Sequence, residues 1–361
     1  MAITKALLFL STTSALLGAC IIDKHDANGD DDDGPPSCGT PNASSAIATT
    51  QNEILSLAIA NGQVYWLDMG GIGSVSAGAG GNGQEIVTSA SSSVFAIGGF
   101  VAANGTDVFW ANGDFPSGTV GRAPATGGTT QVVATTDDPI GVAVDANNLY
   151  WSTFGSSNSA TGTIVSQPLA GGSPTVLASG LATVGPIAVD STSVYFSDMF
   201  GAVSSVPIGG GAVVQLAPAQ QALPADTILD DSPAGIAVAN GRVYWTISSL
   251  GGGTPNAIDS VAITGGAVTT IARPATTPTG IAADDTFVYW SEIGPVTASD
   301  QGLGTPPVED QGSVSRIMND GTGTVQTLAS GASAPVGPVL GENALYYATG
   351  ASAGAIYQVI L

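Results

Sequence analysis

One short pattern of polar and apolar positions recurs along the chain. A polar turn is followed by an aliphatic residue and two aromatic residues, as in residues 240–246, NGRVYWT. The pattern occurs seven times, and its middle aromatic residues lie 41 to 57 residues apart. Repeats of this length are typical of propellers and solenoids. The third position of the pattern holds Trp66, Trp110, Trp151, Phe196, Trp245, Trp290 and Tyr347.

Each repeat predicts four short strands. A small-apolar strand such as residues 233–239, PAGIAVA, precedes the turn, and the aromatic strand follows it. Third and fourth strands follow, as in GTIVSQPLAGG at 162–172 and PTVLASG at 174–180. The turn is Asn-Gly in three repeats, which is a strong hairpin signal. Four antiparallel strands for each repeat indicate the blade of a β-propeller.

We therefore expect an all-β fold, a seven-bladed β-propeller of four-stranded antiparallel blades. The seventh repeat ends at Leu361 after three strands, so its fourth strand must come from elsewhere. Residues 45–51, SAIATTQ, are similar to a fourth strand at 132–136, VVATT. Pairing this N-terminal strand with the last blade closes the ring and removes exposed sheet edges. The propeller domain is predicted to span residues 45–361.

The aromatic strand is predicted to be buried on both faces. A middle strand of a blade packs against a neighbouring blade on each side, which explains consecutive rather than alternating apolar residues. A buried Trp or Tyr covers about 150–250 Å², so each aromatic residue contributes roughly 4–6 kcal/mol of transfer free energy before entropy is subtracted. We interpret the third-position aromatics as structural residues between blades.

The motif Tyr289-Trp290-Ser291-Glu292, followed by Gly312-Ser313-Val314-Ser315-Arg316, resembles the YWTD repeats of LDL-receptor-type propellers. The resemblance implies a propeller fold and protein binding, although YWTD propellers have six blades. The repeat length is also similar to that of seven-bladed streptogramin lyases. Lyases of that family use a histidine base, and residues 45–361 contain no histidine.

The N-terminus predicts export and lipid attachment. Lys5 precedes an apolar run, and residues 17–20, LGAC, resemble the bacterial lipobox, in which the cysteine is acylated after signal cleavage. We expect a signal peptide at 1–19 and a lipidated Cys20 that anchors the protein to a membrane. An ordinary secretory signal with a chance cysteine is the alternative. Ile21 is not an Asp-type inner-membrane retention signal, so the outer membrane is the expected location.

Residues 20–44 have the composition of an acidic, disordered tether. Cys38 has no intramolecular partner if Cys20 carries lipid, and it is either a passive thiol or a crosslink to another protein. Residues 26–30, DANGD, begin like a calcium loop, but Asp31 and Ser37 occupy the positions where Gly and Glu are required. We interpret this stretch as a solvated spacer, and weak calcium binding as the alternative.

The charge of the chain argues against nucleic-acid binding. The formal net charge is −22, and six of the 28 acidic residues precede residue 45. The 22 acidic residues beyond it face four arginines and no lysine, which gives that part a net charge of −18. Phosphate backbones are bound chiefly by cations, which are scarce here.

The long connections all fall on one predicted face. Connections between second and third strands, and crossovers between blades, leave a propeller on the same side, and loops on a rigid scaffold commonly carry binding sites. This face is also acidic, with some residues at the ends of aromatic strands and others, including Asp259, in predicted loops. The candidate binding residues are Asp68, Asn112, Asp198, Asp230, Asp231, Asp259, Glu292, Asp300, Glu309 and Asp310. A calcium site among them is an alternative, although no ligand spacing is recognisable and no cofactor is expected.

Residues 45–361 contain no His, Cys or Lys, which excludes Ser-His-Asp, Cys-His and Schiff-base lysine chemistry and the usual zinc sites there. We expect a non-catalytic, membrane-anchored platform for a protein or glycan partner. The alternative is a carboxylate-based or metal-assisted hydrolase of a glycoside or lactone on the same face.

Overall fold

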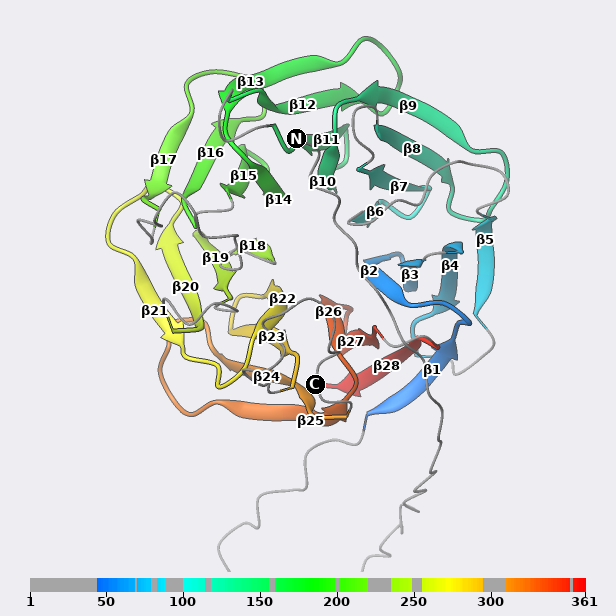
Figure 1. The fold of residues 1–361 in the computed structure, drawn as a ribbon, viewed down its shortest axis with the longest axis vertical. Helices are drawn as coiled ribbons and strands as arrows, with labels where there is room; N and C mark the ends of the chain where they lie inside the picture. The colour runs from blue at the N-terminus through cyan, green and yellow to red at the C-terminus, as the bar shows by residue number, and fades with distance from the viewer. Residues whose placement is uncertain are drawn as a thin grey trace, which may run out of the picture.

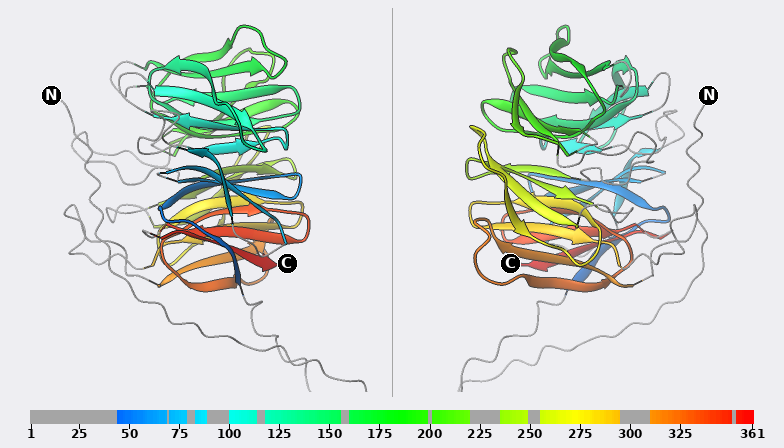
Figure 2. Two further views of the ribbon diagram at one scale, coloured as in Figure 1. Left: turned by 90° about the vertical axis from the view of Figure 1, so that its right-hand side faces the viewer. Right: turned by 60° about the vertical axis from the view of Figure 1, so that its left-hand side comes forward.

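The computed structural model shows a ring of seven four-stranded antiparallel sheets around a central axis (Figure 1). This confirms the seven-bladed propeller that the repeats predict. The two side views show the blades side by side around the ring (Figure 2). The structure describes residues 44–68, 70–78, 83–88, 100–113, 118–155, 160–198, 201–219, 235–248, 255–294, 310–350 and 353–361.

Each blade runs outward from the axis in chain order, except that the last blade takes its outer strand from the N-terminal side. The inner strands are β2 (Ile54–Ala60), β6 (Val101–Ala103), β10 (Pro139–Val144), β14 (Val184–Val189), β18 (Ile236–Ala239), β22 (Pro278–Ala283) and β26 (Pro335–Leu340). The second strands, which carry the aromatic residues, are β3 (Gln63–Asp68), β7 (Asp107–Asn112), β11 (Asn148–Thr153), β15 (Ser193–Asp198), β19 (Arg242–Ile247), β23 (Phe287–Glu292) and β27 (Ala344–Thr349).

The two outer layers complete the blades. The third strands are β4 (Gly71–Ser76), β8 (Gly118–Pro124), β12 (Gly162–Pro168), β16 (Val203–Pro207), β20 (Ala257–Ala262), β24 (Gly312–Met318) and β28 (Ala355–Ile360). The outer strands are β5 (Gln84–Thr88), β9 (Gln131–Thr136), β13 (Thr175–Leu181), β17 (Val214–Ala217), β21 (Thr269–Ala272), β25 (Gln326–Ala332) and β1 (Ser45–Thr49).

The ring closes through the pairing of β1 with β28, as the sequence predicts. Ser45 lies opposite Gln358 and Thr49 lies opposite Ala355 in an antiparallel ladder. Beyond β1, the Thr50 amide donates to the Gly354 carbonyl at 2.8 Å, and the Gly354 amide donates to the Asn52 carbonyl at 3.1 Å. The seventh blade therefore combines the two ends of the propeller domain.

The aromatic residues form the cores between blades. Tyr65 of the first blade and Trp110 of the second share one buried cluster, and Tyr195 and Trp245 share another. The same combination of a middle-position and a third-position aromatic residue recurs between every pair of neighbouring blades. The last cluster joins Tyr346 of the seventh blade to Trp66 of the first. The interpretation of these aromatics as structural is consistent with their burial, since each is at most 5% exposed.

Every outer strand carries a β-bulge at the same place. In β9, Val132 lies opposite Gly121 and Ala134 lies opposite Val120, so Val133 is the extra residue. A bulge bends and twists an edge strand, which hinders pairing with another chain. These edges contain little charge, and we infer that the bulges protect them instead. The bulged residues are Ile47, Ile86, Val133, Leu177, Leu216, Ile271 and Leu328.

Two of the tryptophans lie over glycines of the third strand. Trp110 is opposite Gly121, and a Cβ at Gly121 would lie 2.2 Å from Cε2 of the Trp110 ring. Trp66 is opposite Gly73 in the same way, with a Cβ only 1.9 Å from Cζ2. The absence of a side chain at these positions lets each indole lie flat on the sheet.

We predict that Gly121→Ala lowers the free energy of unfolding by about 2 kcal/mol, because the added methyl group must displace the buried indole of Trp110. Urea unfolding followed by tryptophan fluorescence measures the change. Gly209→Ala is the matched control, because a Cβ there would have no neighbour within 4 Å. Equal stability of the two variants would contradict this role of Gly121.

Candidate functional site

The seven second strands end on one face of the ring, together with the connections to the third strands and the crossovers between blades. We call this the long-loop face, and the opposite face, which carries turns such as Asn61–Gly62, the short-turn face. β1 begins and β28 ends on the short-turn face. Of the ten candidate residues, Asp68, Asn112, Asp198, Asp259, Glu292 and Asp310 are described. Asp230, Asp231, Asp300 and Glu309 lie outside the described residues.

Asp68 is saturated by donors from its own chain. Its Oδ1 accepts hydrogen bonds from the amides of Gly70 and Gly71 at 2.6 and 2.9 Å. Its Oδ2 accepts from Thr50 Oγ1 at 2.6 Å and from Trp66 Nε1 at 3.1 Å. The side chain is 5% exposed. The carboxylate therefore ties the tryptophan to the segment that closes the ring.

Glu292 makes the same connection in the sixth blade. Its Oε1 accepts from Trp290 Nε1 at 2.7 Å, and its Oε2 accepts from Thr276 Oγ1 at 3.0 Å. Thr276 lies in the crossover that leads into this blade, as Thr50 does in the first blade. An acidic residue two positions after the tryptophan thus joins the indole N–H to the preceding crossover.

The other three tryptophans lack this acceptor. The indole Nε1 atoms of Trp110, Trp151 and Trp245 are buried and have no hydrogen-bond partner in the described part of the chain. The residues two positions later are Asn112, Thr153 and Ile247 rather than acids. Two of the acids that define the predicted binding face are therefore acceptors for buried indoles.

Asp198 organises a turn instead. The third-position aromatic of its blade is Phe196, which has no N–H to satisfy. Asp198 Oδ1 accepts from the Ala202 amide at 2.9 Å, and its backbone amide donates to the Ala202 carbonyl at 3.0 Å. The carboxylate thereby holds the start of β16 beside the end of β15.

The placement of Asp259 in a loop is wrong. Asp259 lies within β20, opposite Trp245, and is 2% exposed. The strand begins at Ala257 because the run 257–262, AIDSVA, pairs residue by residue with β19. The loop is therefore shorter than the glycine-rich sequence before it suggests. Asn112 is buried at the end of β7, whereas Asp310 is exposed immediately before β24.

Glu53 is a further acid at this face, where the chain enters β2. Burial raises the pKa of its carboxyl group to about 6. A carboxyl whose folded-state pKa is raised stabilises the fold in its protonated form. This stabilisation is complete below the unfolded pKa and is lost as the pH rises through about 6.

No group of three or more His, Cys, Asp or Glu residues is arranged to hold a metal ion within the described ranges. The same ranges contain no helix with the length and apolar character needed to cross a bilayer.

The polar partners of the acids could not be read from the repeats. Thr50, Asn52 and Thr276 lie in crossovers whose sequences do not repeat, and each reaches a carboxylate 16 to 18 residues away. Tryptophan followed two positions later by an acid is the signal that could have been read, since it occurs at Trp66 and Trp290 alone among the five tryptophans.

No protein-family model matches the chain, and the search of curated proteins finds no match. Solved propellers do match. Virginiamycin B lyase from Staphylococcus aureus is 12% identical, with 88% of this chain and 98% of that chain covered and a TM-score of 0.64. YCF48 from Cyanidioschyzon merolae is 10% identical, with 88% and 99% covered and a TM-score of 0.58. At these identities the likeness shows the fold alone.

A second structure of the same lyase matches the chain in a similar way. That structure, with quinupristin, is of a catalytically inactive variant in which a histidine is replaced by alanine; it shows 13% identity, 88% and 99% coverage and a TM-score of 0.60. In the present chain His25 is the single histidine, and it lies outside the described residues and outside the propeller. Residues 45–361 contain no histidine.

We predict that Asp68→Asn lowers the free energy of unfolding by about 2 kcal/mol, because the amide cannot accept from Thr50, Trp66 and the two glycine amides together. Chemical denaturation gives the value. Asp310→Asn, which changes an exposed acid on the same face, is expected to leave the stability unchanged. If Asp68→Asn unfolded like the native protein, the carboxylate would not be a structural acceptor.

Proposed function

We propose that the protein is a non-catalytic binding platform, exported and held on a membrane by lipid on Cys20, whose long-loop face binds a protein partner. One observation carries the proposal: the chain enters the propeller on the short-turn face, while the long connections leave the opposite face. A tether at residues 20–44 would therefore attach behind the platform.

The two faces differ in how much their connections vary. On the short-turn face, tight turns such as Asn61–Gly62 and Asn240–Gly241 recur with both residues at positive φ. On the long-loop face, the connections at 293–311 and 218–235 are far longer than the connection at 69–70. Uniform turns serve the ring, whereas unequal loops on a rigid scaffold favour recognition.

Charge defines the kind of partner. Asp68 and Glu292 are used by the fold, so recognition falls to the exposed Asp310 and to the loop acids Asp230, Asp231, Asp300 and Glu309. Arg273 is the one arginine among residues 45–361 that follows an outer strand on this side, so few cations oppose these acids. A partner with a basic surface is attracted and oriented by such a field. A glycan partner is the other outcome of the test below.

We do not propose the hydrolase as a second function. Two of the strand-end carboxylates are each bound by several donors within the chain. A catalytic acid or base needs a carboxylate that can reach a substrate proton. A calcium site meets the same difficulty, because ligand oxygens must be available to the ion.

Lipid anchoring at an outer membrane is part of the proposal and rests on residues 17–20 and on Ile21. Multiple acyl chains hold a protein on a membrane without a spanning helix. With the tether behind the ring, the long-loop face would be directed away from the anchoring membrane.

Site-specific photocrosslinking in cells tests the platform. A benzoylphenylalanine residue replaces Asp310 on the long-loop face or, as the matched control, exposed Ala146 in a turn of the short-turn face. We expect a specific adduct from position 310, none from position 146, and loss of both the adduct and membrane fractionation in Cys20→Ser. A protein adduct supports the proposed partner class.

Four results would count against the platform. Adducts from both positions to the same extent would mean that the faces are not distinguished. No adduct from position 310, or a carbohydrate adduct only, would remove the protein partner. Membrane fractionation that survives Cys20→Ser would remove the lipid anchor.

A further inference from the structure

A paired aspartate and tyrosine stabilise three turns of the short-turn face. In the third blade, Asp145 Oδ1 accepts from the amides of Asn147 and Asn148, both at 2.7 Å, and Asp145 Oδ2 accepts from the Tyr150 hydroxyl at 2.7 Å. Asp190 with Tyr195 and Asp284 with Tyr289 repeat the arrangement at 2.8 and 2.9 Å. In each case the aspartate precedes the tyrosine by five residues.

The other four blades lack this aspartate and have Ala60, Asn104, Ala239 and Gly341 at its position, so the seventh blade alone has no side chain there. Gly341 occupies the position five residues before Tyr346. The Tyr346 hydroxyl instead meets Gln358, whose Nε2 donates to it at 3.2 Å. If the amide is oriented this way, the hydroxyl proton has no acceptor in the described part of the chain. If the amide is reversed, its NH₂ group is released. At least one donor of this pair is available in either orientation.

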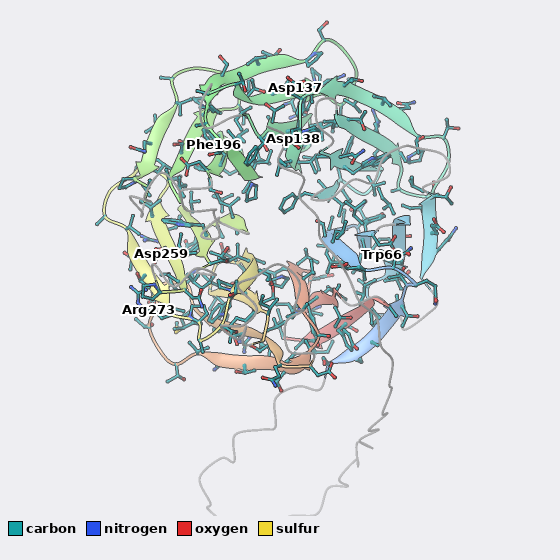
Figure 3. All side chains as sticks on the ribbon, viewed as in Figure 1. Trp66, Asp137, Asp138, Phe196, Asp259 and Arg273 are labelled. Atoms are coloured by element: carbon teal, nitrogen blue, oxygen red, sulfur yellow. The ribbon has the colours of Figure 1, made fainter. Side chains whose placement is uncertain are left out.

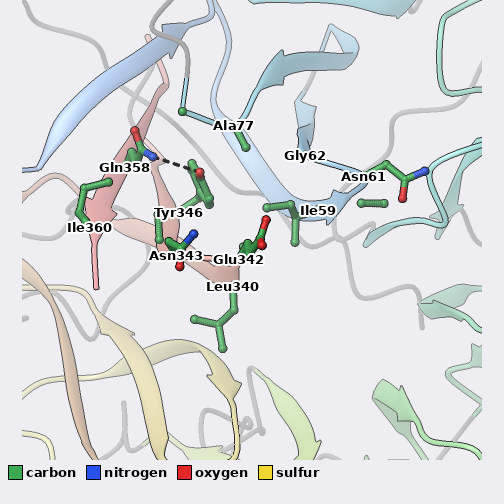
Figure 4. A pocket seen from close by; sticks show the side chains of 14 residues that line it. Ile59, Asn61, Gly62, Ala77, Leu340, Glu342, Asn343, Tyr346, Gln358 and Ile360 are labelled. Carbon is green, nitrogen blue, oxygen red and sulfur yellow. Dashed lines mark hydrogen bonds between the residues drawn. The ribbon is translucent and has the colours of Figure 1, made fainter.

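A groove of about 430 Å³ opens at this position, between the seventh and first blades (Figure 4). A Cβ at Gly341 would lie 2.9 Å from Cε2 of Tyr346 and 3.0 Å from Cδ1 of Ile59. The missing side chain therefore makes room for the groove. Its volume lies within the range of small-molecule sites.

The lining combines aliphatic walls with three polar side chains, of which one is negatively charged and none is positively charged. Ile59, Leu340 and Ile360 supply the apolar walls, and Ile360 is 54% exposed. Asn61, Asn343 and Glu342 supply polar groups, and Figure 4 shows the Glu342 side chain between Leu340 and Ile59. Glu342 is the acid among the lining residues, and neither Lys nor Arg is among them.

We propose that this groove binds a primary ammonium on an aliphatic chain, such as a small alkylamine or a lysine side chain. The ammonium group pairs with the Glu342 carboxylate, and the aliphatic chain lies against Ile59 and Leu340. Where the ligand carries an acceptor at its other end, as the backbone of a lysine residue does, the pair of Tyr346 and Gln358 donates to that acceptor. The net charge of −18 for the propeller domain favours a cationic over an anionic ligand.

This site is separate from the proposed function, because it lies on the opposite face from the long loops. Figure 3 shows side chains filling the spaces between blades around the ring. The labelled residues Trp66 and Asp259 lie in different blades. A failure of the groove would leave the platform unaffected, and the converse also holds.

Titration with hexylammonium chloride tests the charge preference. The purified protein carries Cys20→Ser so that no lipid competes for the apolar probe. We expect saturable binding by calorimetry, with shifts of the Asn61 and Asn343 side-chain amides in ¹H–¹⁵N spectra, and much weaker binding of hexanoate. Glu342→Gln should weaken hexylammonium binding about threefold, the scale of an exposed ion pair, and leave hexanol binding unchanged.

Two further variants locate the site. Gly341→Asn places at this position the side chain type that the second blade has at Asn104, fills the groove without adding a charge that would attract the ammonium, and should abolish binding while the protein still unfolds cooperatively. Asp285→Asn removes an exposed acid at the corresponding turn position of the sixth blade and should leave binding unchanged. The proposal is overturned if no probe binds, if hexanoate binds as tightly as hexylammonium, if Gly341→Asn still binds, or if Glu342→Gln and Asp285→Asn weaken binding equally.

Discussion

Burial of aromatic side chains between neighbouring blades is the interaction on which this structure depends. Each blade supplies its middle aromatic residue to one core and its third-position aromatic residue to another, so no single blade can cover both. A blade outside the ring would expose both faces of its second strand to water. The cores therefore require a closed ring, and the pairing of β1 with β28 supplies the closure.

This constraint explains the role of the acids that end the aromatic strands. Burial of an indole N–H without an acceptor is costly, and Trp110, Trp151 and Trp245 bear this cost in the described part of the chain. Asp68 and Glu292 remove it for Trp66 and Trp290 and at the same time hold the crossovers next to their blades. The repeated residues thus serve the packing of the ring. A functional site is expected where the repeats differ from one another.

The fold could be predicted from the sequence because the repeat reports directly on burial. The triplets, the turns and the incomplete seventh repeat predict the blade number and the closing strand. The site could be predicted only in outline. The glycine-rich run before Asp259 hides the start of β20, so the sequence alone places this residue in a loop. The role of Asp68 depends on Thr50, which lies in a non-repeating crossover. The groove exists because Gly341 has no side chain. In the third blade the equivalent position holds Asp145, whose hydrogen bond with Tyr150 is visible only in the structure.

Native-state hydrogen exchange of a variant without residues 45–49 is the most direct measurement of the central claim. If the cores between blades require the closed ring, amides of β11 and β15, on the far side from the closure, lose protection together with those of β27. If β11 and β15 keep full protection while β27 and β28 alone exchange, the blades do not depend on closure, and the account of the ring is contradicted.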